Sequence, residues 1–497
     1  MKKAMKKLMA ALLAVAMVCA MAIPAWAADA GTTTTAAGTT YTITISDPVG
    51  TYEAYQIFSG DLHDGVLSNV AWGTGVTAAG KLALGNAKDK ANALKTNVDA
   101  KAFAAEVGKY LDAPSGTYAA GKITDLSAGY YLVKNSSVGL NETYTSFILA
   151  VVKDVTVIPK GDKPTLEKKV KDANDTKGDI SDWQDSADHD IDDDVPFQLT
   201  ATIASNFADY KTYKFVFHDE QSAGLTFKPD TVEVTVGGIK LTPDKYDVIT
   251  NTGDKCTFHV VINDLKQIAS AAAGAEVVVE YTSTLNEKAK IGSDGNPNEA
   301  HLEYSNNPHN SNDTTNTPND KVTVFTFKVV ANKINGADNQ SLKGAAFALY
   351  KNYDSDWKLV GLCNATTGTD GNYIIANPDR ISFEWVGLDD GEYMIKEIIT
   401  PAGFNTIADQ TFTVDATHDT NSDNPQLTVL NGTLKTGEIT FTSDKSAGSL
   451  TTNIVNNRGA TLPSTGGIGT TIFYVIGGGL MVAAAILLIT KKRMENR

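Results

Sequence analysis

Cysteine is scarce in this chain of 497 residues, which contains three. Cys19 lies in the N-terminal leader described below, so only Cys256 and Cys363 remain, and the strand pattern assigns them to two different domains. Exported proteins of this size commonly use disulfides for stability. At most one pair is available here and we expect none, which makes another kind of covalent stabilisation worth seeking.

Signatures of enzymes and of nucleic-acid binding are also missing. The chain has no phosphate-binding loop and no nucleophile elbow, and its seven histidines show no ligand spacing. Its formal net charge of −15, which becomes more negative without the basic ends, argues against nucleic acid as a ligand. The acidic run 185–194 lacks the glycine and the final glutamate of an EF-hand loop, so we interpret it as a solvated loop. We expect neither a metal nor a cofactor.

Both ends of the chain carry targeting signals. Residues 1–27 hold four lysines, an apolar stretch and the small-x-small sequence AWA, which predict a cleaved signal peptide and an exported protein. Residues 471–490 contain no charge and precede the basic sequence KKR, so they predict a membrane-spanning helix with a cytoplasmic tail. The pentapeptide LPSTG stands just before this helix.

The region between the two signals is too long for one core and predicts about three domains. Strand and turn patterns dominate, so the predicted class is mainly β, with β-sandwich domains. The Ala/Leu/Lys-rich segment 80–112 is the exception and predicts one or two helices inserted in the first domain. The predicted boundaries are 28–160 for the N-terminal domain, 164–320 for the middle domain, 321–461 for the C-terminal domain and 462–497 for the terminal targeting region.

Polar side chains interrupt the apolar faces of several predicted strands. Residues two apart face the same side of a strand, so a polar residue in step with an apolar row points into the core. Because a buried polar group without a partner costs several kcal/mol, we expect such residues to meet within each domain. They are Lys333, Glu397 and Asn456 in the third domain, and Lys168, Asp219 and Asn306 in the middle domain.

An amine, a carboxyl and a carboxamide in one core can form a covalent bond. Desolvation shifts a lysine toward its neutral, nucleophilic form, and a protonated carboxyl can polarise the carboxamide and shuttle protons while ammonia leaves. The product is an intramolecular Lys–Asn amide that needs neither oxidant nor cofactor. The alternative is a buried ion pair between the lysine and the acid, with a hydrogen bond from the asparagine.

Two segments of the third domain connect the chain to a known family. GEYMIKEIITPAGF, residues 391–404, is similar to the Y-x-L-x-E-T-x-A-P-x-G-Y box of collagen-adhesin B-type domains in Gram-positive surface proteins, and residues 332–350 resemble the first strands of that domain. The departures are Ile398, Ile399, Thr400 and Phe404, and none of them is the acid Glu397. The whole chain resembles the major backbone pilins of sortase-assembled pili. This implies tandem immunoglobulin-like β-sandwich domains of the collagen-adhesin A and B types.

In those pilins such triads form spontaneous isopeptide bonds. The bonds implied here are Lys333–Asn456, assisted by Glu397, and Lys168–Asn306, assisted by Asp219. For the middle domain, alternatives remain open. Lys169 is an alternative to Lys168, Asn307 to Asn306, and Asp193 or Asp194 to Asp219. The first domain has Asn135 at the position of Glu397 and no lysine in its first strand, so we expect no bond there.

The pentapeptide matches the L-P-x-T-G sorting motif of the same family. Its residues are Leu462, Pro463, Ser464, Thr465 and Gly466. The resemblance implies that a membrane sortase cuts after Thr465 and joins the Thr465 acyl group to an amine. The segment VTVIPK resembles the pilin motif that supplies this amine, here Lys160, with Ile158 in place of the usual aromatic residue or histidine. Pro159 should end the strand and present Lys160 at the domain junction.

We therefore expect a structural protein rather than an enzyme: the shaft subunit of a pilus, exported and anchored to the cell wall. The expected partners are a class C pilin sortase, a housekeeping sortase, other copies of the chain, minor or tip pilins, and peptidoglycan, with no nucleic acid. The alternative is a monomeric wall-anchored adhesin that binds a host or dietary ligand. A glycosidase is more remote, because no further carboxylate pair stands out.

Overall fold

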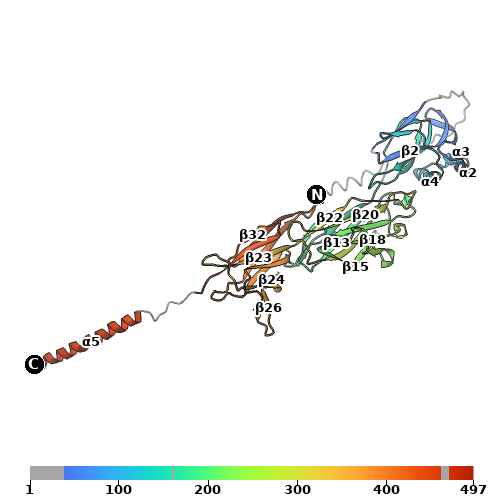
Figure 1. The fold of residues 1–497 in the computed structure, drawn as a ribbon. Helices are drawn as coiled ribbons and strands as arrows, with labels where there is room; N and C mark the ends of the chain where they lie inside the picture. The colour runs from blue at the N-terminus through green and yellow to red at the C-terminus, as the bar shows by residue number, and fades with distance from the viewer. Residues whose placement is uncertain (1–38, 47, 159–161, 460–468, 496–497) are drawn as a thin grey trace. The chain divides into compact units, whose positions relative to one another are not determined.

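The computed structural model describes residues 39–46, 48–158, 162–459 and 469–495. Within these residues the larger sheets form three pairs, which occupy the ranges 41–157, 165–325 and 327–456 without exchanging strands (Figure 1). The mainly β class predicted from the sequence is confirmed. Contacts group the chain into two units: unit 1 contains the first two sheet pairs, and unit 2 contains the third.

The first sheet pair is a sandwich of two four-stranded sheets, with the orders β4-β5-β1-β8 and β3-β2-β6-β7. The strands are β1 (Tyr41–Ile45), β2 (Thr51–His63), β3 (Val66–Trp72), β4 (Thr117–Ala119), β5 (Lys122–Leu126), β6 (Gly129–Ser137), β7 (Ser146–Val151) and β8 (Val155–Val157). Alternating residues such as Ile43 and Ile45 of β1, or Tyr131 and Val133 of β6, are buried in one cluster. This alternation is what a strand with one face on the core requires.

Three short helices, rather than one or two, form the insert between β3 and β4. They are α2 (Ala78–Leu84), α3 (Ala87–Ala93) and α4 (Asn97–Val107), followed by the 3-10 turn η1 (Gly108–Tyr110). Thr77, Asn86 and Thr96 each accept a hydrogen bond from the first turn of the helix that follows, and Thr96 forms a capping box with Asp99. These caps divide the Ala/Leu/Lys-rich pattern into three separate helices.

The middle sandwich has a five-stranded and a seven-stranded sheet. The first has the order β16-β15-β19-β13-β9 and contains β9 (Thr165–Val170), β13 (Asp194–Thr202), β15 (Leu225–Val236), β16 (Ile239–Lys240) and β19 (Glu276–Leu285). The second has the order β12-β22-β20-β14-β18-β17, with β21 on β20. It contains β12 (Ser186–Asp188), β14 (Phe215–Gln221), β17 (Asp247–Ile249), β18 (Phe258–Ile262), β20 (Asn296–Ser305), β21 (Thr314–Asn316) and β22 (Asp320–Phe325).

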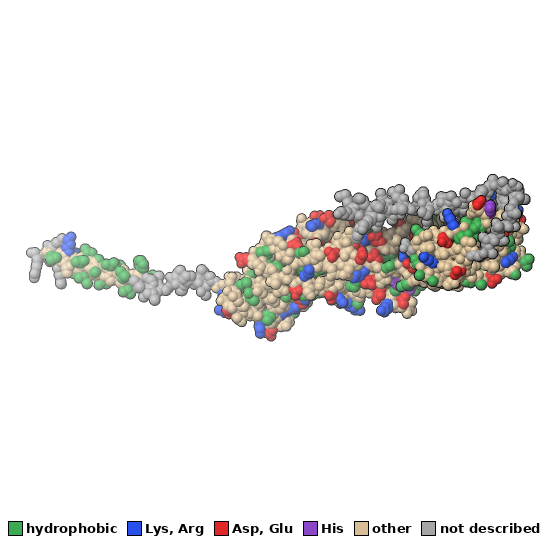
Figure 2. All heavy atoms as spheres, turned by 90° about the horizontal axis from the view of Figure 1, so that it is seen from above, with side chains coloured by type: hydrophobic (Ala, Val, Ile, Leu, Met, Phe, Trp, Pro, Cys, Tyr) green, Lys and Arg blue, Asp and Glu red, His purple; other side chains and the backbone are tan. Residues whose placement is uncertain are grey.

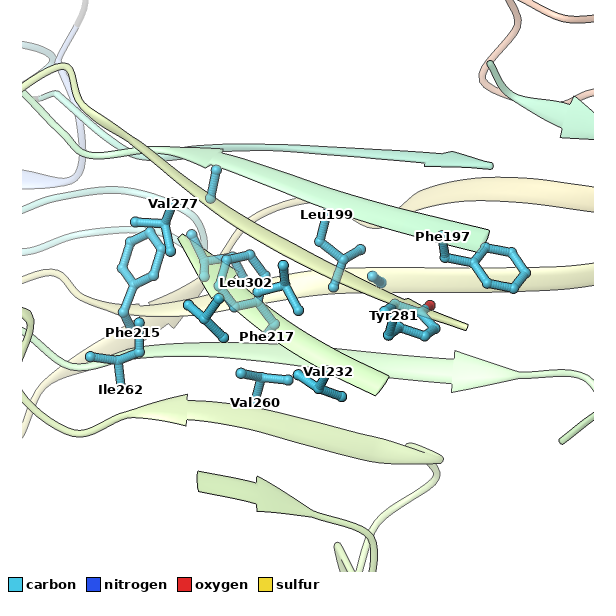
Figure 3. Packing of buried hydrophobic residues seen from close by; sticks show 14 of the residues in the cluster. Phe197, Leu199, Phe215, Phe217, Val232, Val260, Ile262, Val277, Tyr281 and Leu302 are labelled. Atoms are coloured by element: carbon cyan, nitrogen blue, oxygen red, sulfur yellow. The ribbon is translucent and has the colours of Figure 1, made fainter. Parts of the chain in front are cut away.

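Aromatic and aliphatic side chains from both of these sheets fill the core between them (Figure 3). Phe215 and Phe217 of β14 lie against Leu302 of β20, while Leu199 and Tyr281 come from the facing sheet. Truncating a buried phenylalanine to alanine typically costs about 3–5 kcal/mol. A core of this kind can therefore hold the neighbouring buried polar groups in fixed positions.

The acidic run 185–194 is not a solvated loop, so that interpretation is wrong. Ser186, Ala187 and Asp188 form β12, pair with β22 in parallel and are buried, as is His189. Ser186 Oγ lies 2.7 Å from His418 Nδ1, and Asp188 lies 3.8 Å from His418 Nε2. The acidic composition suggested a solvated loop. The local sequence does not show the partners that bury this segment, because they lie far along the chain, as His418 does.

Unit 2 contains the third sandwich. One sheet has the order β28-β23-β33-β32 and contains β23 (Phe327–Asn335), β28 (Ser382–Leu388), β32 (Phe441–Asp444) and β33 (Ser449–Asn456). The other has the order β25-β24-β29-β30-β31 and contains β24 (Ala346–Tyr353), β25 (Asp356–Cys363), β29 (Gly391–Ile399), β30 (Gln410–His418) and β31 (Leu427–Thr436). The first and last strands, β23 and β33, run parallel as neighbours.

Two short segments belong to a different unit from the residues that flank them. Residues 174–178 are part of unit 2, where Asn174 Nδ2 donates to Asp390 Oδ1 at 2.6 Å. Residues 417–428 are part of unit 1, where the Ser422 backbone N–H donates to Asp185 Oδ2 at 2.7 Å. The predicted domain boundary between residues 320 and 321 does not account for these two exchanged segments, each of which belongs to the other unit.

The last described element is the helix α5 (Gly469–Glu495). Its segment Phe473–Lys492 has a mean hydropathy of 2.2 and is long and apolar enough to cross a membrane. Apolar side chains are exposed along it, from Phe473 to Ile489, and Figure 2 shows them in green on the helix surface. The predicted span, 471–490, lies within this helix.

Candidate functional site

Lys333, Glu397 and Asn456 meet in the interior of unit 2, and all three are buried. Lys333 is on β23 and Asn456 is the last residue of the adjacent strand β33, while Glu397 comes from β29 in the facing sheet. The parallel register pairs Lys333 with Ile454. The amine therefore lies near the end of β33, where Asn456 is located.

The three side chains contact one another directly. The Lys333 ammonium touches Asn456 Oδ1 and donates to the main-chain oxygen of Ile454 at 3.0 Å. Asn456 Nδ2 donates to both carboxylate oxygens of Glu397, at 3.0 and 3.1 Å. The backbone N–H of Ile407 donates to Glu397 Oε2 at 3.1 Å, which holds the carboxylate in place. Lys333 Nζ lies 3.9 Å from Glu397 Oε1.

This arrangement can form an amide. Burial lowers the pKa of Lys333 to about 8, against the opposing charge of Glu397, so a neutral, nucleophilic fraction of the amine is accessible. Its lone pair can attack Cγ of Asn456, while Glu397 takes a proton from the amine and passes it to the departing nitrogen. The Nζ–Cγ bond forms, the Cγ–Nδ2 bond breaks, and ammonia leaves.

A second buried lysine, Lys168 of β9, lies in the core of the middle sandwich. Its Nζ is 2.5 Å from Asp219 Oδ2, on β14 of the facing sheet, and donates to the Tyr281 hydroxyl at 2.9 Å. The Tyr281 hydroxyl donates to Asp219 Oδ2 at 2.7 Å and accepts from Asn298 Nδ2, on β20, at 2.9 Å. All four side chains are buried, so an amine, a carboxyl, a phenol and a carboxamide form one network.

Burial shifts the pKa values of the amine and the carboxyl in this network toward their uncharged forms. Burial lowers the pKa of Lys168 and raises the pKa of Asp219, although the charge of each opposes the shift of the other. Asp219 Oδ1 and Asn298 Oδ1 are buried acceptors that make no hydrogen bond, and such groups are costly. A proton on the Asp219 carboxyl would supply a donor among these acceptors. A neutral amine and a protonated acid are the reactants that amide formation needs.

Asn306, the asparagine expected at this site, is not part of the network. It follows the end of β20, and its Nδ2 donates to the main-chain oxygen of Glu142 at 3.1 Å. Asn298 and Asn306 both belong to the buried, even-numbered row of this strand, so periodicity alone cannot choose between them. The register decides, because it pairs Asp219 with Ala300, next to Asn298 on the same face. Asn298, and not the expected Asn306, is the asparagine that contacts this network.

The residues left open as alternatives also lie outside the network. They have other partners: Lys169 pairs with Asp185, Asn307 with Asp313, Asp193 with His189, and Asp194 with Lys228. Lys169 neighbours Lys168 on β9 and points to the opposite face of the strand. Lys168 and Asp219 are thus the lysine and the acid that the structure brings together.

A third buried lysine was missed by the sequence reasoning. Lys351 of β24 contacts Asp389 and lies 2.9 Å from Asp175. The alternation of the strand could have revealed it, because Lys351 continues the inward-facing row formed by Phe347 and Leu349. With two carboxylates in contact with the Lys351 ammonium, this site has the form of a buried ion pair.

In the first sandwich, Asn135 of β6 is a structural amide. Its Nδ2 donates to the main-chain oxygen of Val49 at 2.6 Å, and its Oδ1 accepts from the Thr145 backbone at 2.7 Å. The remaining predicted site residues lie outside the described part of the chain. They are Lys160, Leu462, Pro463, Ser464, Thr465 and Gly466.

Two family descriptions match parts of the chain. Residues 327–433 match the SpaA prealbumin-like fold domain, and residues 454–496 match the LPXTG cell wall anchor motif. The trypsin-resistant surface T6 protein of Streptococcus pyogenes serotype M6 is 26% identical over an alignment of 363 positions, which covers 60% of this chain and 64% of that protein. The match thus spans less than two thirds of that relative.

A solved pilin structure shares the fold. The T6 backbone pilin of serotype M6 Streptococcus pyogenes, described as a modular three-domain structure, aligns with a TM-score of 0.53 and 19% identity, over 85% of this chain and 98% of that one. The major pilin SpaD from Corynebacterium diphtheriae aligns with a TM-score of 0.45 and 17% identity, over 84% and 97%. The chain thus shares the fold of that T6 backbone pilin and carries an LPXTG cell wall anchor motif. In this backbone-pilin fold, Lys333 and Glu397 lie within the prealbumin-like match, and Asn456 lies within the anchor match.

Proposed function

We propose that the chain is the shaft subunit of a covalently polymerised pilus that is anchored to the cell wall. The observation that carries this proposal is the cell wall anchor motif directly after a backbone-pilin fold. A class C pilin sortase cuts between Thr465 and Gly466 and joins Thr465 to Lys160 of the next copy. A housekeeping sortase then attaches the polymer to peptidoglycan, and minor or tip pilins complete it. Before cleavage, α5 holds the precursor in the membrane.

The same proposal includes two internal amides, Lys333–Asn456 and Lys168–Asn298. Glu397 assists the first, and Asp219, held by Tyr281, assists the second. The buried contacts of each set support this, because each places an amine, an acid and a carboxamide in one network. The domain division at 28–160, 164–320 and 321–461 is kept, with residues 174–178 and 417–428 exchanged. The chain is then a sortase substrate, and its own chemistry is a single turnover.

Polymerisation is tested by expressing the full chain together with a class C pilin sortase and examining cell-wall extracts on denaturing gels. We expect a ladder of high-mass species that disappears in the Lys160→Ala variant. Lys163→Ala, a change at a nearby and partly exposed lysine, is the matched control and should keep the ladder. A ladder that persists in Lys160→Ala excludes Lys160 as the amine. If the unchanged chain forms no ladder, it is a monomeric adhesin rather than a shaft subunit.

A further inference from the structure

Three histidines form one row across the seven-stranded sheet of the middle sandwich. His218 of β14 pairs directly with His259 of β18 on one side and with His301 of β20 on the other. The ring centroids are 4.0 Å apart for His218 and His259, and 4.5 Å apart for His218 and His301. Because three separate strands supply these residues, their proximity does not appear as ligand spacing in the sequence.

The segment before β18 adds two further groups of the kind that bind metals. Cys256 Sγ lies 3.8 Å from His218 Nδ1. Asp254 Oδ2 lies 3.1 Å from His259 Nε2 and 3.9 Å from His218 Nδ1. The Cys256 backbone N–H donates to the other oxygen, Asp254 Oδ1, at 2.8 Å, which orients the carboxylate. One atom from each of these four side chains lies within 4.8 Å of the others.

A further carboxylate orients His218. Glu303 Oε2 lies 3.3 Å from His218 Nε2, and Lys214 holds the other oxygen of Glu303 at 2.9 Å. The ring proton is therefore placed on Nε2, and the lone pair of Nδ1 is directed to Cys256 and Asp254. A carboxylate on the far nitrogen is the usual support of a metal-binding histidine. Nothing in the cross-linking networks requires this arrangement.

We propose that His218, Asp254, Cys256 and His259 bind one zinc ion. Two imidazole nitrogens, a thiolate and a carboxylate are ligand types that zinc takes in tetrahedral sites, whereas calcium prefers a shell of oxygens. With bonds of about 2.0–2.3 Å, the ligand atoms of a tetrahedral site are roughly 3.3–3.8 Å apart. The three measured separations, 3.1, 3.8 and 3.9 Å, are close to this range. Binding releases the proton of the Cys256 thiol to solvent.

The proposed zinc site is distinct from the cross-linking network of the same sandwich. His218 and Asp219 are consecutive on β14, so their side chains point to opposite faces of the sheet. The His218 and His259 side chains are 13% and 12% exposed, and Asp254 is 46% exposed, so an ion can reach a site that is otherwise enclosed. A bound ion would tie the segment 254–256 to β14 and β18, in a chain whose described cysteines form no disulfide.

Zinc affinity of the untagged full-length chain in detergent is measured by competition with a chromophoric chelator, and stoichiometry by titration calorimetry. We expect one zinc per chain. Cys256→Ser and His259→Ala should each weaken binding by at least about tenfold, and Glu303→Gln by about 10–100-fold. Two matched controls, Cys363→Ser and His301→Ala, change the same residue types outside the proposed ligand set. We expect both controls to keep the affinity within about threefold.

A spectroscopic measurement tests the proposed thiolate ligand directly. Cobalt(II) added to the unchanged chain should produce the near-ultraviolet charge-transfer band of a thiolate–cobalt bond, and Cys256→Ser should lose this band. The proposal is overturned if the unchanged chain binds no zinc or if its cobalt complex lacks the band. Unchanged affinity in both Cys256→Ser and His259→Ala also overturns it. Equal losses in His301→Ala and His259→Ala would refute the assigned ligand set.

Discussion

A buried lysine is stable only if its amine is neutral or if an opposite charge lies beside it, because an isolated buried charge is very costly. Lys168 and Lys333 are both buried and both have an acid within 4 Å. An ion pair alone would need no third group. In each network an asparagine is nevertheless present, Asn456 in direct contact and Asn298 through Tyr281. Its presence favours amide formation over a permanent ion pair.

The assignment of Asn298 rather than Asn306 can be tested by mass. Each amide releases one ammonia, about 17 Da, so the processed unchanged chain should be about 34 Da lighter than its sequence mass. Asn298→Ala should reduce this deficit to about 17 Da, because Lys168 then has no carboxamide to attack. Asn306→Ala, a change at an asparagine on the same strand face, should keep about 34 Da. Intact-mass spectrometry measures all three.

The opposite pattern, with the loss confined to Asn306→Ala, would contradict the assignment that rests on the register of β14 and β20. A full sequence mass for the unchanged chain would contradict amide formation in both sandwiches.

At the scale of elements, the proposed Lys333–Asn456 bond would join the first and last strands of the third sandwich. The two residues are 123 positions apart, so the bond closes nearly the whole sandwich into a loop. If an amide constrains the unfolded chain as a disulfide does, a loop of about 100 residues contributes about 4–5 kcal/mol. A single bond between the neighbouring central strands β23 and β33 can thus protect the entire sandwich.

Glu397→Gln should abolish this protection with little change in shape. The amide side chain cannot relay the proton, so we expect the mass deficit to fall to about 17 Da. We expect the free energy of unfolding of unit 2 to fall by about 4–5 kcal/mol, measured by denaturant titration. Glu384→Gln, at a partly exposed acid of β28 paired with Lys328, is the control and should change it by less than about 0.5 kcal/mol. Undiminished ammonia loss in Glu397→Gln would remove Glu397 from the mechanism.

The stability of unit 1 should depend on pH through His418, which lies in the exchanged segment 417–428. Burial opposes a charge on this ring, but hydrogen bonds to Asp172 and Asp188 outweigh it and raise the pKa of His418 to about 9. The folded state therefore binds this proton more tightly than the unfolded chain does. Its stabilising effect is complete below a pH of about 6.5 and is lost as the pH rises through about 9.

We expect the free energy of unfolding of unit 1 to fall by on the order of 2–3 kcal/mol between about pH 6 and about pH 10 through this group. His418→Gln should remove that component, and denaturant titrations at the two pH values measure it. His63→Gln, at a histidine whose side chain is 89% exposed, is the control and should keep the fall. Identical pH profiles for His418→Gln and the unchanged chain would contradict the coupling.

Strand patterns predicted the sandwich class and the inward-facing Lys168, Lys333, Asp219 and Glu397, because alternation with apolar neighbours is a local property. They did not choose between Asn298 and Asn306, since both follow the same alternation and only the pairing of β14 with β20 separates them. The row of His218, His259 and His301 was also not predictable, because it exists only across paired strands. The docking of residues 174–178 and 417–428 likewise depends on partners far along the chain.

For the whole molecule, the proposed bonds define which residues carry force in a pilus. In the proposed polymer, tension would enter at Lys160 and leave at Thr465. The covalent path visits, in order, Lys160, Lys168, Asn298, Lys333, Asn456 and Thr465. It bypasses residues 169–297 and 334–455. Only roughly 50 of the roughly 300 residues between the two ends can therefore be drawn out. At full extension these residues span about 170–190 Å, whereas the whole segment would span about 1,000 Å. The two amides thus make most of the chain inextensible.

Single-molecule pulling between handles at positions 160 and 465 measures this limit. The unchanged chain should extend by no more than about 170–190 Å before rupture. Asn298→Ala should release the loop 169–297 and Glu397→Gln the loop 334–455, each adding roughly 400–460 Å. The double variant should approach about 1,000 Å, while Asn306→Ala should behave as the unchanged chain. An unchanged chain that extends to about 1,000 Å would show that neither amide lies on the path of force, whatever the buried networks permit chemically.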